Sequence, residues 1–241
     1  FQAVTIVVSF GLIGIAMGWA LKKNDEPFKV LGIGCAASLL SKIALVFLSM
    51  LMIGINPLTQ EIEILRESLS MASEFYKSMG MDPQTIKDTI DSFNRSLDML
   101  PLVIPGIFIL ASIFDSFLTY VVTKAVLSRM GQKLKDFTPF WRWRFPEYTV
   151  AFFLFGNLLA LLETYWPVGV LRSIGANLSL VFGFVFFVQG FSLLSFYLGK
   201  YNAGKAFRLF IAFFVLFNPF FLQILFFAGL FDILFNFRKI Y

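Results

Sequence analysis

The sequence contains no histidine, and Cys35 is its only cysteine. A metal or haem held by histidine and a Ser-His-Asp triad are therefore excluded, and no disulfide can form within these 241 residues. Catalysis would have to depend on Asp115, Glu163 or Asp232, and no spacing joins these carboxylates into a two-carboxylate motif. We expect no metal, no cofactor and no enzymatic activity.

Charged residues are also scarce. They make up 15% of the chain, whereas 58% is hydrophobic and 33 residues are phenylalanine, which is far from the composition of a soluble domain. The sequence predicts an all-α, polytopic transmembrane helix bundle in which residues 1–241 form a single membrane domain. About six segments are apolar and long enough to cross a bilayer, namely 1–21, 28–55, 101–127, 149–165, 173–198 and 206–235.

Residues 58–98 interrupt this apolar pattern. Hydrophobic residues recur there at helical spacing in two stretches, and Gly80, Asp82 and Pro83 mark a helix end, a cap and a helix start between them. The stretch 57–100 carries eight acidic and four basic side chains. We predict a helical hairpin between the second and third spans. It is either a self-packed cap with an acidic side in water, or a lid or partner-docking surface.

Lysine and arginine residues indicate the orientation. They concentrate around Lys22, between Lys124 and Arg144, and around Lys200. The positive-inside rule places these connections in the cytoplasm and the acidic hairpin outside a bacterial cytoplasmic membrane. Because the whole chain carries a formal charge of +5 despite its acidic hairpin, the basic membrane part favours anionic lipid as a partner, not nucleic acid.

The last apolar segment contains Asn218-Pro219 near its centre. Proline removes a helical hydrogen bond and clashes with the preceding turn, so this pair predicts a kink or break. Six full crossings would place Arg238 and Lys239 outside, against the positive-inside rule, unless the segment is a re-entrant pair. The segment is short for two full crossings, so we expect one long, kinked span.

Lys42 and Asp115 are the charged residues closest to the middle of the second and third spans. The two spans are joined by the hairpin, so they run antiparallel, and both charges lie roughly 20 Å below the shared surface at the helical rise per residue. An unpaired charge at the bilayer centre costs about 2.5–3.5 kcal/mol on insertion scales. We therefore predict an ion pair between Lys42 and Asp115.

Hydroxyl groups accompany Asp115 along one side of the third span. We group them with the pair and with two amides of later spans as a candidate polar cavity for a small-molecule ligand, comprising Lys42, Asp115, Ser112, Ser116, Thr119, Asn157 and Gln189. The alternative is that the hydroxyls bond to carbonyls of their own helix and that Asp115 serves only the ion pair.

Basic and aromatic residues alternate in the connection 128–148. Arginines beside tryptophans at the end of a span are typical of the membrane interface. A docking element for a protein partner is the alternative, and its candidate residues are Trp141, Arg142, Trp143 and Arg144.

Five short motifs resemble the YybS-type family of bacterial integral membrane proteins, a domain of unknown function: Gly18-Trp19-Ala20-Leu21-Lys22-Lys23, Tyr76-Lys77-Ser78-Met79-Gly80-Met81, Leu100-Pro101, Gly229-Leu230-Phe231-Asp232 and Phe237-Arg238-Lys239. The resemblance covers essentially the whole chain. It implies further spans before Phe1, in agreement with an apolar segment that opens without a charged flank. The family is distantly similar to the substrate-capture (S) components of energy-coupling-factor transporters and to the rod-shape protein MreD. No functional residues can be carried over from these likenesses.

Two functions remain open. The first is a small-molecule binding or transport subunit resembling an S component, with the polar cavity as its site, the hairpin as a lid and the basic connection as the contact to an energising partner. The second is a non-transport membrane scaffold in envelope or spore assembly, in which Lys42 and Asp115 are structural and the hairpin binds another protein. A direct, closed Lys42–Asp115 contact favours the scaffold, whereas an open polar chamber favours ligand binding.

Overall fold

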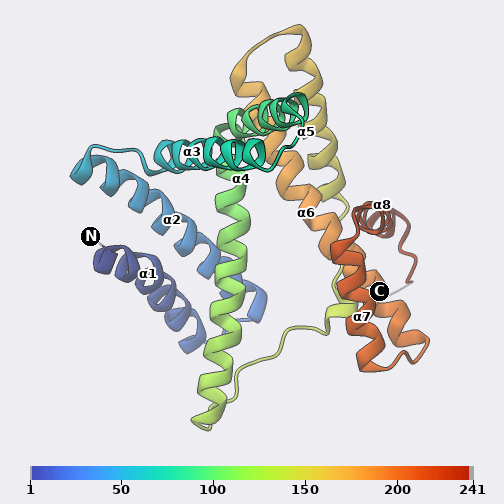
Figure 1. Cartoon of the computed structure of the whole chain (residues 1–241). Helices are drawn as coiled ribbons and strands as arrows, with labels where there is room; N and C mark the ends of the chain where they lie inside the picture. Colours follow the sequence, from blue (N-terminus) through green and yellow to red (C-terminus); the bar gives the residue numbers. More distant parts are fainter. Residues whose placement is uncertain (1, 239–241) are drawn as a thin grey trace. The chain divides into compact units, whose positions relative to one another are not determined.

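The computed structural model describes residues 2–238, and within that range the secondary structure is entirely helical (Figure 1). The helices fall into two compact units, divided between Leu134 and Lys135. Each unit is built around its own apolar contacts, and each is described by itself below. The expectation of a single membrane domain stays a prediction.

The first unit contains four helices: α1 (Gln2–Lys22), α2 (Pro27–Ile53), α3 (Pro57–Ser78) and α4 (Pro83–Arg129). α2 packs against both α1 and α4. Gly34 of α2 allows the close approach, because a Cβ atom there would collide with the Ser116 hydroxyl of α4 and the Met17 side chain of α1. Met17 and Tyr120 are buried in this interface.

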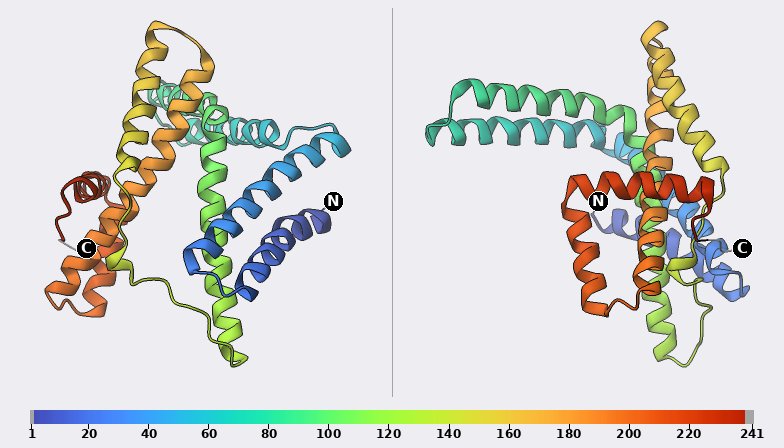
Figure 2. Two further views of the ribbon diagram at one scale, coloured as in Figure 1. Left: turned by 180° about the vertical axis from the view of Figure 1, so that it is seen from behind. Right: turned by 90° about the vertical axis from the view of Figure 1, so that its right-hand side faces the viewer.

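α3 and the first part of α4 form the expected hairpin (Figure 2). Asn56 caps α3, and Asp82 caps α4 by accepting hydrogen bonds from the backbone N–H and the hydroxyl of Thr85. The backbone N–H of Thr85 lowers the pKa of the Asp82 carboxyl. Arg66 of α3 reaches across to Asp98 of α4 at 2.5 Å.

The hairpin helix and the third span, expected to meet at Pro101, are one helix of 47 residues, so Pro101 is not a helix end. Pro101 and Pro105 lie inside it. Each proline removes one backbone donor and distorts the preceding turn, and Figure 2 shows α4 changing direction after the part that lies beside α3. The change in composition at Pro101 therefore marks a bend and not a helix end.

The second unit contains η1 (Phe140–Arg142), α5 (Tyr148–Tyr165), α6 (Gly169–Lys200), α7 (Lys205–Phe217) and α8 (Pro219–Phe235). α6 is central, since α5, α8 and η1 all pack on it. Gly156 and Gly175 let α5 and α6 approach closely, as a Cβ atom on Gly156 would lie 2.8 Å from Leu178 Cβ. Phenylalanines fill the space between these helices, with Phe186 fully buried against Phe153 and Phe226.

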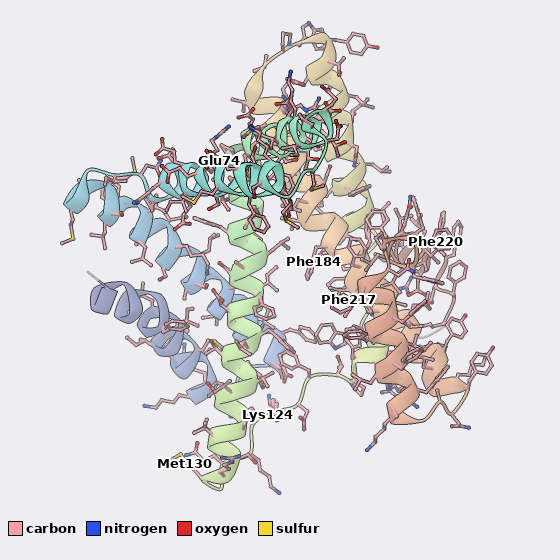
Figure 3. All side chains as sticks on the ribbon, viewed as in Figure 1. Glu74, Lys124, Met130, Phe184, Phe217 and Phe220 are labelled. Carbon is pink, nitrogen blue, oxygen red and sulfur yellow. The ribbon has the colours of Figure 1, made fainter. Side chains whose placement is uncertain are left out.

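The break expected at Asn218-Pro219 is confirmed. α7 and α8 meet there at a bend of 103°, and Asn218 caps α8 by accepting from the Phe220 backbone N–H. Figure 3 labels Phe217 and Phe220 on either side of the bend. A bend of this size does not fit one long, kinked rod, so the pair is a broken span or a re-entrant loop. Lys239, which the orientation argument joins to Arg238, lies outside the described residues.

Four helices of the described range are long and apolar enough to cross a membrane, namely α2, α4, α5 and α6. The bent α7–α8 pair makes five if it is counted as one span, and α1 contributes a shorter apolar stretch over Phe10–Lys22. The prediction of a polytopic, all-α membrane protein is confirmed. Six spans and the outer location of the hairpin stay predictions.

Candidate functional site

The predicted ion pair between Lys42 and Asp115 is present in the first unit. The Lys42 ammonium contacts Asp115 Oδ2 directly. Ser38, one turn before Lys42 on α2, accepts a hydrogen bond from the ammonium at 2.7 Å and donates one to the same carboxylate oxygen at 3.0 Å. Because α2 and α4 approach closely at Gly34, three polar groups of two helices form a closed triangle.

The hydroxyls next to Asp115 have different surroundings. Ser116 donates to the backbone carbonyl of Leu31 on α2 at 2.7 Å, so it bonds across helices and not within its own. The Ser112 hydroxyl is fully buried and has no hydrogen-bond partner among the described residues. Thr119 is half-buried on the same helix.

The Lys42 and Asp115 side chains are 23% and 34% exposed. A charge pair in a spanning helix with an exposed side must face protein or a polar cavity, because lipid solvates charge poorly. Two open hollows of the described structure lie away from this pair: one lies over Asp88, Asp91 and Asp98, and the other over residues 144–148.

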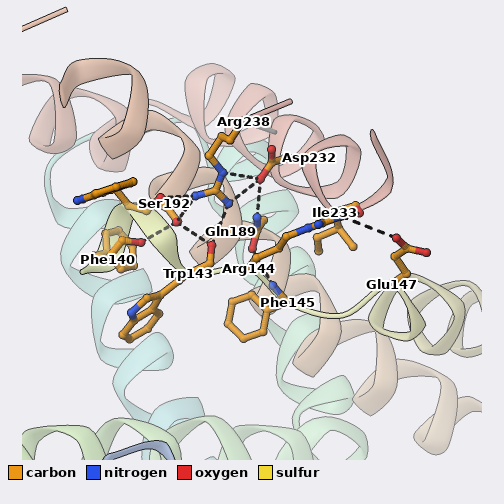
Figure 4. Close-up of polar contacts among 11 residues, drawn as sticks. Phe140, Trp143, Arg144, Phe145, Glu147, Gln189, Ser192, Asp232, Ile233 and Arg238 are labelled. Carbon is orange, nitrogen blue, oxygen red and sulfur yellow. Dashed lines mark hydrogen bonds and ion pairs between the residues drawn. The ribbon is translucent and has the colours of Figure 1, made fainter. Parts of the chain in front are cut away.

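A second polar cluster lies in the other unit, and the sequence reasoning missed it. Arg238 and Asp232 form an ion pair at 2.7 Å, with their side chains 2% and 0% exposed (Figure 4). Gln189 of α6 donates to the same carboxylate oxygen at 2.5 Å. Ser192, one turn further along α6, accepts from Arg238 at 2.8 Å. This network is more deeply buried than the Lys42–Asp115 pair.

The network holds residues 140–145, in the connection before α5, against α6 and the end of α8. Arg238 donates to the backbone carbonyls of Trp141 and Trp143, and Ser192 donates to those of Phe140 and Trp143. The Gln189 side chain accepts from the Phe145 backbone N–H at 3.1 Å. Backbone groups of an irregular segment are thereby satisfied by side chains of two helices, as burial requires.

Some of the four residues named as a partner surface contact the buried network, and others lie at the surface. Trp141 and Trp143 contribute their backbone carbonyls to the buried network. Arg144 donates to the Ile233 carbonyl at 3.3 Å and lies 3.8 Å from Glu147. Arg142 is exposed and stacks on the Trp141 ring at 4.6 Å. Much of this segment therefore contacts its own chain.

The candidate cavity residues are divided between the two units. Lys42, Asp115, Ser112, Ser116 and Thr119 belong to the first unit, and Asn157 and Gln189 belong to the second. Asn157 donates to the Phe153 carbonyl one turn earlier in its own helix, and Gln189 belongs to the buried network.

One signal for the missed network was present in the sequence. Asn236 caps α8 in the left-handed region at φ 47°, a conformation that asparagine tolerates better than most residues. The chain reverses there and returns Arg238 to Asp232. An asparagine after an apolar helix, followed by an arginine, could have indicated this return.

The comparisons with known proteins agree with the resemblance read from the sequence. The family model described as "Predicted membrane protein (DUF2232)" matches residues 1–233. The uncharacterized protein YybS of Bacillus subtilis (strain 168) is 26% identical over 239 residues, which is 99% of this chain and 76% of that protein. No solved structure matches. The polar clusters thus belong to a multi-pass membrane chain, and this chain is a member of the DUF2232 family of predicted membrane proteins.

Proposed function

We propose that the protein is a membrane-embedded assembly partner, a scaffold that holds another protein at a bacterial cytoplasmic membrane. The proposal assigns it no catalytic step. One observation carries it: most polar side chains named for a ligand cavity are already engaged by protein groups. Lys42 and Asp115 bind each other, Ser116 binds the Leu31 carbonyl, and Gln189 binds Asp232.

The hairpin supplies the surface that such a scaffold needs. Glu63, Glu67 and Glu74 are exposed and, at spacings of four and seven, share one side of α3. Figure 3 labels Glu74 on this helix. An acidic side of this kind suits a partner that presents basic residues, because complementary charge raises the association rate and rejects like-charged surfaces.

A second candidate is the small-molecule binding or transport subunit resembling an S component. The buried, unpartnered hydroxyl of Ser112 favours it, as do the exposed sides of Lys42 and Asp115. In this function the pair would open to receive a ligand with a carboxylate or ammonium group, and Ser112 would complete the site.

The two candidates give different results for two variants. In native gels of membranes solubilised in mild detergent, the scaffold predicts a complex larger than the 27.4 kDa chain. The complex should survive Lys42→Met with Asp115→Leu and dissociate in a Glu63→Gln, Glu67→Gln, Glu74→Gln variant. A chain that migrates alone, and whose melting temperature rises with a carboxylate ligand such as biotin only while Lys42 and Asp115 are intact, would replace the scaffold with the second candidate.

A further inference from the structure

The hairpin helix α3 has three distinct sides. Ile62, Leu69 and Ser73 face α4 and are buried or half-buried. The glutamates described above lie on the second side. The third side is apolar and open: Ile64, Met71 and Phe75 are 46%, 68% and 60% exposed, and their spacings of seven and four place them in one stripe along the helix. We refer to these three residues as the apolar stripe.

An exposed apolar stripe next to an acidic one is the pattern of a helix that lies in the membrane interface. Such helices gather their apolar side chains on one side and their charged side chains on another, and their overall hydrophobicity is low. In water alone, the apolar stripe would leave about 25 cal/mol of unfavourable free energy for each square ångström of apolar surface exposed. A cover over the apolar stripe would remove this cost.

The chain connections indicate what that cover is. α2 ends at Ile53 and α3 begins at Pro57, so α3 starts where an apolar span ends. At the other end of the hairpin, α4 continues without interruption into its spanning part. Both ends of the hairpin thereby join helices that are long and apolar enough to cross a membrane, so α3 begins next to the end of such a helix.

The direction of the hairpin agrees with this position. Figure 2 shows α3 and the first part of α4 turned aside from the remainder of α4. A hairpin that continued along the span would carry α3 roughly 30 Å into the water at the helical rise per residue. Turned aside, it remains close to the plane of the headgroups. The acidic side would then stay in water.

We infer that α3 is a membrane-surface helix whose apolar stripe inserts into the lipid interface, leaving its glutamates in water. The occupant of the stripe is lipid, not a protein. The inference does not depend on the proposed scaffold, since a lid or a scaffold could use a hairpin anchored in this way.

Quenching of a single fluorophore tests the inference. In a Cys35→Ser background, Phe75→Cys and, as the matched control on the acidic side, Glu67→Cys are labelled with an environment-sensitive maleimide dye. The full chain is then placed in phosphatidylcholine vesicles that contain nitroxide-labelled lipid. The dye at position 75 should emit at shorter wavelength, be quenched several-fold more by the lipid nitroxide than the dye at 67, and resist iodide in the water. The dye at 67 should show the reverse.

Two results would overturn it. Equal quenching of both dyes by iodide would place the apolar stripe in water. Protection of position 75 from iodide without quenching by lipid nitroxide would show that a protein surface, such as a second copy of this chain, covers it. Met71→Cys repeats the measurement on the same stripe, so a folding defect at one position cannot decide the outcome.

Discussion

Lys42 and Arg238 each pair with a single aspartate, yet only one of the two pairs could be found from the sequence. Lys42 and Asp115 lie on different helices at equal depth, and depth follows from counting residues along two antiparallel spans. Arg238 comes after the end of α8 and reaches Asp232 only because Asn236 reverses the chain. Counting residues along a helix does not predict a contact made by a residue that lies beyond the end of that helix.

Replacing one partner of the Lys42–Asp115 pair should cost more than replacing both. Lys42→Met leaves a carboxylate without its counter-charge at membrane depth, and the expected loss of unfolding free energy is about 3 kcal/mol. Lys42→Met with Asp115→Leu should be nearly neutral, because two apolar side chains of similar volume satisfy the same space. Unfolding in mixed micelles titrated with a denaturing detergent measures both. A double variant as unstable as the single one would contradict this account.

Gly229 should not tolerate a methyl group. A Cβ atom there would collide with the Phe186 carbonyl and with the Gly190 backbone on α6, and rigid backbone cannot move aside as a flexible side chain can. Gly229→Ala should lower the unfolding free energy by about 1–3 kcal/mol, the usual range for overpacking. Gly199→Ala is the control, since a Cβ atom at that glycine meets nothing within 4 Å. Equal stabilities of the two variants would refute the close contact of α6 and α8.

At the scale of whole helices, the sequence pattern predicts a helix start correctly where a capping residue precedes the proline. Asp82 caps α4 as expected, and Asn56 caps α3 in the same way. Pro101 has no such cap before it and lies within a helix. Proline alone permits either a bend or an end, and the packing of α4 against both α3 and α2 favours the continuous helix here. The distinction depends on contacts between distant segments, which local patterns do not contain.

Removing the signal at Asn218-Pro219 should straighten the last segment. In Asn218→Leu with Pro219→Ala, a continuous helix would separate spin labels at Phe207→Cys and Phe231→Cys by roughly 36 Å at the helical rise. The 103° bend of the parent gives a separation of roughly 22 Å between the same positions. Double electron–electron resonance on both proteins, in a Cys35→Ser background, distinguishes the straight helix from the bent one. An unchanged distance would mean that packing, not the Asn-Pro pair, imposes the bend.

At the scale of the molecule, composition was sufficient to identify a helical membrane protein, whereas a candidate site chosen by polarity does not come with the contacts of its residues. Asn157 and Gln189 join Lys42 in the candidate cavity on polarity alone. Polarity does not specify which neighbour a side chain meets, and both amides make their contacts within the second unit. The charge count favours an outer hairpin by the positive-inside rule, an argument independent of any contact.

The hairpin should be dispensable for membrane insertion, because its helices satisfy their own backbone groups and are joined to the spans at one surface only. Replacement of residues 58–98 by a short flexible linker should leave the protease-protection pattern of the remaining spans unchanged. In the intact chain, Met81→Cys at the hairpin turn should react with an impermeant maleimide in whole cells, and Lys133→Cys should react only after permeabilisation. Labelling of position 133 in whole cells, with position 81 labelled only after permeabilisation, would show that the orientation is the opposite of the one predicted.

The continuity of α4 has a mechanical meaning. Asp115, which pairs with Lys42, and the segment that packs against α3 belong to the same 47-residue helix. Any force that lifts or tilts the hairpin is either absorbed at Pro101 and Pro105, where two backbone hydrogen bonds are missing, or transmitted as torque to Asp115. The two prolines therefore stand between the hairpin and the Lys42–Asp115 pair, at the point where such a force would bend the helix most easily.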